Sequence, residues 1–172
     1  MRYRKAALIA APLVIAGAIA GAVTAGQAGV EAAPTSFAAS LSSYSEVPAN
    51  STKATGTVTL TLTSATSLDY TLSYSNASSS VMFAHIHFAQ EDVNGGIAAF
   101  LCGGGDKPAC PETSGEVSGT IDPADVIGPS GQGIAAGEFN EVIKAMRKSK
   151  TYANVHTSNF TAGEFRGQIH PS

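Results

Sequence analysis

The most restrictive feature of this sequence is a strict alternation of polar and apolar residues between positions 57 and 63. The segment reads Thr-Val-Thr-Leu-Thr-Leu-Thr. Successive side chains of a β-strand point to opposite faces, so this pattern predicts a strand with one buried face and one solvated face. Residues 68–74 repeat the alternation after a short turn rich in Ser and Thr. The two segments together predict a pair of consecutive strands.

Short apolar segments continue along the chain at a similar spacing. One helical pattern interrupts them over residues 137–148, where apolar residues recur on one side of the predicted helix. Many short strands with turn signals between them are typical of sandwiches and barrels. The sequence therefore predicts an all-β fold, an antiparallel Greek-key β-sandwich or barrel with one short helix. The further predicted strands cover residues 37–44, 81–89, 97–101, 115–121, 151–156 and 164–170.

The first 33 residues have the composition of an export segment. A basic stub over residues 1–5 precedes an uncharged apolar stretch over residues 6–25, and small residues follow it. This layout predicts a secretory signal peptide, and the length of the apolar stretch leaves an uncleaved N-terminal anchor as the alternative. In either case we expect a single exported domain over residues 34–172, secreted, periplasmic or at the cell surface.

The charge of the predicted domain limits its partners. From residue 34 onward the chain has 7 Lys and Arg against 12 Asp and Glu, a net charge of −5 with neutral histidines. Nucleic acids and anionic lipid surfaces attract basic proteins, so neither is expected as a partner. Contact with a membrane is expected only through an uncleaved N-terminal segment. An unidentified extracellular or cell-surface partner stays open.

The chain has two cysteines, Cys102 and Cys110, on either side of a Gly-rich segment. In an exported protein two cysteines most often pair, so we expect a disulfide that closes this short loop. The alternative is a cysteine-based metal site. The spacing of the two cysteines differs from that of zinc motifs, which favours the disulfide.

The four histidines are the residues most directly suited to chemistry. His85 and His87 lie two apart in a predicted strand, and His156 lies in another. The period of two puts Ala84, Ile86 and Val155 on the core face, so these histidines point outward. Three converging imidazoles suit copper or zinc, with His170 as a candidate fourth ligand. The alternative is that they brace the sheet through hydrogen bonds, and the sequence does not decide whether the strands are neighbours.

Four motifs follow one another along the chain, which are Ala84-His85-Ile86-His87, Asn94-Gly95, the segment from Tyr152 to Thr157, and the segment from Gly163 to Ile169. In this order they resemble the CHRD domain, the module repeated in chordin, and the resemblance covers residues 37–169. It implies a β-sandwich or barrel module of extracellular proteins whose molecular activity is undefined.

A looser resemblance connects the chain to the Greek-key barrel of copper-zinc superoxide dismutase. It implies a copper site at His85, His87 and His156 and makes Arg166 a candidate anion guide. The alternative for Arg166 is a structural ion pair with Glu164 or Glu46. No histidine occurs between His87 and His156, so the bridging ligand of a two-metal dismutase has no counterpart.

Three hypotheses for function follow from the sequence. The first is an exported CHRD-like module that binds copper, zinc or an extracellular partner through the histidines. The second is a copper-dependent redox enzyme with dismutase-like chemistry. The third is a structural or adhesive surface module. No serine-histidine-aspartate arrangement and no phosphate-binding glycine motif is apparent in the sequence.

Overall fold

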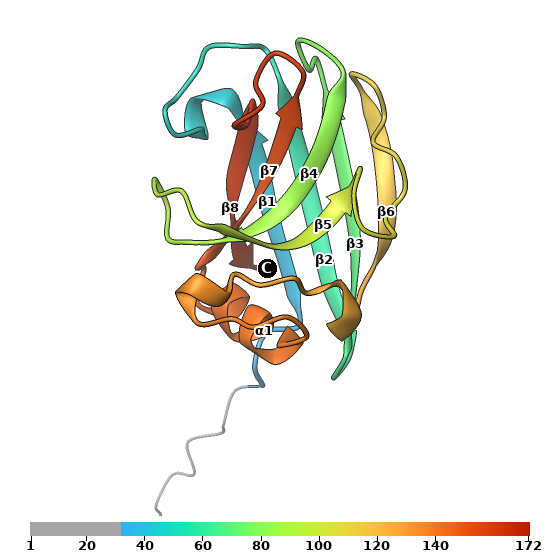
Figure 1. Cartoon of the computed structure of the whole chain (residues 1–172), viewed down its shortest axis with the longest axis vertical. Helices are drawn as coiled ribbons and strands as arrows, with labels where there is room; N and C mark the ends of the chain where they lie inside the picture. The colour runs from blue at the N-terminus through green and yellow to red at the C-terminus, as the bar shows by residue number, and fades with distance from the viewer. Residues whose placement is uncertain (1–31) are drawn as a thin grey trace, which may run out of the picture. The chain divides into compact units, whose positions relative to one another are not determined.

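The computed structural model describes residues 32–172, and these form one antiparallel β-domain with a short helix. The predicted export segment over residues 1–33 lies outside the described residues except for its last two. Figure 1 shows the strands curving around a common interior, with α1 across one end. The eight strands are β1 Ser36–Ser42, β2 Thr55–Ser64, β3 Ser67–Ser75, β4 Val81–Phe88, β5 Gly96–Cys102, β6 Gly115–Ile121, β7 Thr151–Thr157 and β8 Phe165–Pro171.

The strands pair in the order β5-β4-β7-β8-β1-β2-β3-β6, and every pair is antiparallel. The edge strands β5 and β6 approach each other, so the sheet closes almost completely into a barrel. After β4, β5 and β6, the chain returns through β7 to pair with β4, which is a Greek-key connection. The predicted fold class is confirmed.

The predicted alternation of buried and exposed side chains is confirmed. In β2, Val58 and Leu60 are buried, whereas the alternate residues Thr57, Thr59 and Thr61 point outward. The interior of the barrel is filled by such apolar residues from all eight strands. Tyr70 of β3 adds a polar contact there, because its hydroxyl donates to the Leu101 carbonyl of β5 at 2.6 Å. This buried hydrogen bond connects the two sides of the barrel near the unpaired edges.

The helix α1, Phe139–Arg147, closes one end of the barrel. The predicted apolar side is confirmed, because Phe139, Val142, Ile143 and Met146 all join the core. Three short 3-10 turns complete the fold, η1 Ser43–Ser45, η2 Pro123–Asp125 and η3 Ser130–Gln132. Within residues 32–172, the structure contains no helix of the length and hydropathy needed to cross a bilayer.

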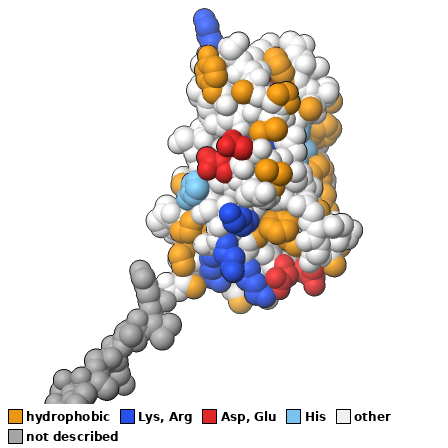
Figure 2. Space-filling model, turned by 90° about the vertical axis from the view of Figure 1, so that its left-hand side faces the viewer, with side chains coloured by type: hydrophobic (Ala, Val, Ile, Leu, Met, Phe, Trp, Pro, Cys, Tyr) orange, Lys and Arg blue, Asp and Glu red, His pale blue; other side chains and the backbone are white. Residues whose placement is uncertain are grey.

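The outer surface is mostly polar and uncharged. On the face drawn in Figure 2, white surface predominates, and the Lys and Arg side chains gather mainly toward one end. Ser and Thr side chains on the outer faces of β1, β2 and β3 account for much of this character. Only 13% of the residues in the sequence are charged, which agrees with the few charged side chains on this face.

Candidate metal centre

Two neighbouring strands bring three of the four histidines together. β4 carries His85 and His87, and β7, its antiparallel partner, carries His156. In this register His85 lies opposite Asn154 and Phe83 lies opposite His156, so His156 is diagonal to His85 and the three imidazoles share one face of the strand pair. Each offers a ring nitrogen, and these three atoms lie within 4.8 Å of one another. The strand adjacency that the sequence left open is thus established.

Strand alternation assigned these side chains to the correct face, but the prediction that they point outward to solvent was wrong. Ala84 and Ile86 face the core, and the histidines lie on the opposite face of the sheet. His85, His87 and His156 are nevertheless only 5%, 7% and 9% exposed. Loops and aromatic side chains cover this part of the sheet, so the three imidazoles form a buried cluster.

Aromatic rings provide much of this cover. Phe100 of β5 meets the His85 ring edge-on at a centroid distance of 4.5 Å, and Phe83 stacks near the same ring at 5.9 Å. Tyr152 of β7 stacks on His87 at 4.8 Å with the planes only 7° apart. The rings fix the imidazole planes and keep water away from them.

Backbone carbonyls hold two of the three imidazoles. Nδ1 of His87 lies 2.9 Å from the Gly95 carbonyl, and Nδ1 of His156 lies 3.0 Å from the Thr161 carbonyl. A carbonyl oxygen only accepts, so each Nδ1 carries the hydrogen and each Nε2 presents a lone pair. Both Nε2 atoms are buried without a hydrogen-bond partner, as is Nδ1 of His85. One nitrogen per ring is therefore left free inside the cluster.

Burial keeps these imidazoles neutral. Loss of solvation, followed by repulsion from His156 and His87, lowers the pKa of His85 to about 3. Loss of solvation also lowers the pKa of His87 to about 4, with smaller contributions from His156 and Arg166. The pKa of His156 is lowered mainly by burial. Neutral imidazole is the form that binds metals, so the cluster needs no deprotonation at neutral pH.

The separation of the ring nitrogens is close to that of a metal site. Metal–nitrogen bonds of about 2.0–2.1 Å place three ligands of one ion about 3–4 Å apart. The observed limit of 4.8 Å is somewhat wider. This limit exceeds the range of a metal site by about 1 Å, so small side-chain rotations would bring the nitrogens to a shared ion.

The fourth histidine lies elsewhere. His170 is exposed on β8, and its Nδ1 contacts the Ser149 hydroxyl at 3.0 Å. The cluster of candidate ligands found among residues 32–172 contains His85, His87 and His156 alone. The structure therefore does not bring His170 together with the three.

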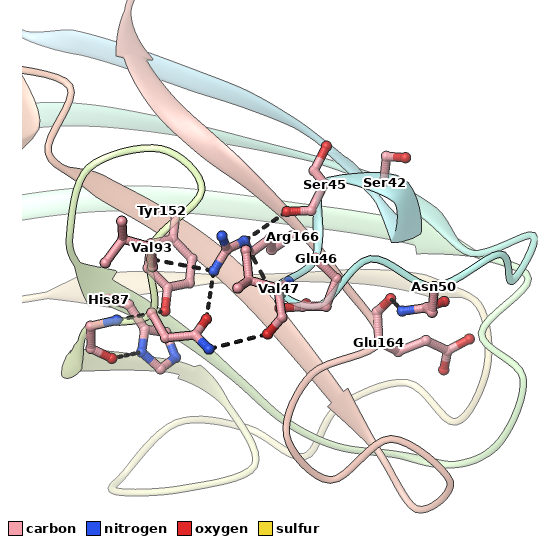
Figure 3. A network of polar contacts seen from close by, with 12 residues as sticks. Ser42, Ser45, Glu46, Val47, Asn50, His87, Val93, Tyr152, Glu164 and Arg166 are labelled. Carbon is pink, nitrogen blue, oxygen red and sulfur yellow. Dashed lines mark hydrogen bonds and ion pairs between the residues drawn. The ribbon is translucent and has the colours of Figure 1, made fainter.

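Arg166 forms a buried polar network beside the cluster. Its Nε donates to the Ser45 carbonyl at 2.8 Å, and one terminal nitrogen donates to the Asn94 side chain at 2.9 Å. The Glu46 carboxylate lies 3.9 Å from Nε, which matches one of the two ion pairs considered from the sequence. The guanidinium also lies 4.5 Å from the centre of the Tyr152 ring. Figure 3 shows Arg166 joining the Ser45–Val47 segment to the loop at Val93.

Glu164 has a separate role that sequence reasoning missed. It was considered as an ion-pair partner of Arg166, but its side chain is fully buried and bonded elsewhere. Its two carboxylate oxygens accept from the Ser78 backbone at 3.0 and 3.3 Å, and its own carbonyl accepts from the Asn50 side chain at 2.8 Å. These contacts join segments far apart in the chain, and no local pattern predicts them.

The expected disulfide is present. Cys102 and Cys110 are bonded and close the Gly-rich loop after β5. Gly104 in this loop packs directly against the Phe100 ring, which leaves no room there for a side chain. The loop thus supports one of the aromatic rings that cover His85. A disulfide agrees with an oxidising, exported environment.

The comparisons with known proteins identify the module. A family model described as CHRD domain matches residues 37–169, the extent inferred from the motifs. No curated protein and no solved structure matches the chain. Because the match covers most of the sequence, this chain belongs to the CHRD domain family.

Proposed function

We propose that this protein is an exported CHRD module that binds a copper or zinc ion through His85, His87 and His156. The observation that carries the proposal is the set of three buried, unpartnered ring nitrogens within one cluster. Buried polar atoms are almost always hydrogen-bonded, and each exception calls for an explanation. A shared metal ion would satisfy all three atoms at once.

The hydrogen bonds to Gly95 and Thr161 support metal binding over simple bracing. Metal-binding histidines usually donate their second ring nitrogen to a carbonyl or carboxylate, which orients the first toward the ion. His87 and His156 have this arrangement. Histidines that only brace a sheet would be expected to have both nitrogens paired with protein groups.

Export is the second part of the proposal. The disulfide and the composition of residues 1–33 both support an extracellular or periplasmic location. Sequencing the N-terminus of the protein recovered from culture medium and from membranes would separate a cleaved signal peptide from an anchor. Protein found only in the cytoplasm would contradict export.

A dismutase-like enzyme has less support than a binding module. An anion guide needs a guanidinium with free donors near the reaction site, whereas Arg166 is 3% exposed and bonded to Ser45 and Asn94. Superoxide removal by the copper-loaded protein would test the enzyme directly. A rate above that of the metal-free protein would favour it.

Calorimetric titration with zinc tests metal binding. We expect one ion per chain for the wild type and for His170→Ala, which removes the histidine outside the cluster. His87→Ala removes one of three ligands, so its affinity should fall by about 100-fold or more. Circular dichroism would confirm that each variant folds. Equal affinities for the wild type and His87→Ala would overturn the proposal.

A further inference from the structure

The charge of the cluster limits the kind of ion that it can hold. His85, His87 and His156 are neutral ligands, and no Asp, Glu or Cys joins them in the cluster found among the described residues. A bound ion therefore keeps its full charge inside a buried site. The cost of moving an ion from water into a poorly polarisable interior rises with the square of its charge, so a dication costs roughly four times as much as a monocation.

The neighbouring charges do not offset this cost. Tyr152 stacks on His87 and also contacts the Arg166 guanidinium, so a permanent positive charge lies one ring away from the cluster. The nearest carboxylate in this network is Glu46, and its charge is opposed by Arg166 at 3.9 Å. This network therefore leaves no surplus negative charge to balance a second positive charge on the ion.

The surroundings of His85 are apolar as well. Its ring lies within 4.5 Å of the Phe100 centroid and 5.9 Å of the Phe83 centroid. A hydrophobic shell lowers the local polarisability and excludes water, and both effects favour the lower oxidation state of a bound metal. The apolar shell and the absence of a carboxylate in the cluster thus both favour the ion of lower charge.

The number of ligands points the same way. Cupric ion favours square-planar or tetragonal sites, which need four or more donors. The cluster supplies three, and His170, the remaining histidine, is exposed on β8 and paired with Ser149. Cuprous ion has a closed d shell and imposes no such geometry, so three nitrogens are sufficient for it.

We propose that this site holds copper as the cuprous ion in preference to the cupric ion. The inference rests on the metal binding proposed above and adds to it the oxidation state that the site favours.

Redox titration of the copper-loaded full-length protein tests the preference. The reference is copper in excess imidazole in the same buffer, which offers the same donor atoms in water. A tenfold preference for the cuprous state raises a one-electron potential by about 59 mV, and we expect at least this shift relative to the reference. The electron is supplied by ascorbate through a mediator, and each cupric ion takes up one.

A charge variant makes the test specific. Asn154 lies opposite His85 in the β4–β7 register, so Asn154→Asp puts a carboxylate beside the cluster. This variant should lower the potential by at least about 59 mV, a tenfold loss of preference. Asn140→Asp adds the same charge on the exposed surface of α1 and should leave the potential unchanged.

The outcomes separate the two proposals. A potential above that of the imidazole reference supports the cuprous preference, even if Asn154→Asp fails to fold. A potential at or below the reference overturns the preference and leaves metal binding intact. Failure to bind copper in either oxidation state, together with failure to bind zinc, overturns both.

Discussion

Replacing Arg166 with methionine tests whether the guanidinium is a structural brace. Methionine keeps an apolar stem but removes the donors to Ser45 and Asn94, and it leaves the Glu46 carboxylate without an opposing charge. Both side chains of the ion pair are almost fully buried, at 3% and 4% exposure. Removing one partner of a buried pair costs about 3–5 kcal/mol. The charges are 3.9 Å apart and not in direct contact, so we expect the lower end of that range.

Urea unfolding at neutral pH measures this loss, and a double-mutant cycle assigns its cause. Burial raises the pKa of Glu46, and Arg166 opposes that rise, so removing Arg166 should raise the pKa further. Glu46→Gln removes the buried charge. The double variant should therefore lose about 1 kcal/mol less stability than the sum of the two single variants. Strict additivity, or a loss below about 1 kcal/mol for Arg166→Met, would refute the brace and favour a role in anion guidance.

Three further predictions concern stability. First, acid should destabilise the metal-free protein between pH 6.5 and 4. The pKa of His87 is about 4 in the folded protein, so in this range His87 takes up a proton only in the unfolded chain, and that favours unfolding. The free energy of unfolding lost through this residue is at most about 2 kcal/mol near pH 5. The stability of His87→Gln should therefore depend less on pH than that of the wild type. An unchanged pH dependence would contradict the burial of His87. Second, Tyr70→Phe leaves the buried Leu101 carbonyl without its donor and should cost about 1–3 kcal/mol in urea unfolding, whereas no loss would mean that water replaces the hydroxyl. Third, replacing Cys102 and Cys110 with serine opens a loop with a sequence separation of 8 and should cost about 2.5 kcal/mol in thermal unfolding; an unchanged melting temperature would show that packing alone holds the loop.

The strands were predictable because the signal for them is local. The alternation around Val58 and Leu60 depends only on adjacent residues, and the structure has β2 at that place. The end of β1 was less predictable. The strand was expected to continue to residue 44, but the Ser42 hydroxyl accepts from the Tyr44 backbone and turns the chain into η1.

The candidate site was only partly predictable, because its burial comes from distant segments. Alternation placed His85 off the core, which is correct. Its cover comes from Phe100 on β5, and the carbonyl that holds His156 comes from Thr161 in the next loop. Loops carry no periodic pattern, so the sequence gives no sign that they fold over this face. The full burial of Glu164 escaped prediction for the same reason.

Metal binding by this protein requires that three particular ring nitrogens share one ion. Nitrogen-detected NMR of the histidine rings during a zinc titration observes these atoms individually. We expect Nε2 of His87, Nε2 of His156 and Nδ1 of His85 to shift together and saturate at one zinc per chain, while His170 stays unchanged. Unshifted cluster nitrogens, or a response confined to His170, would contradict this expectation.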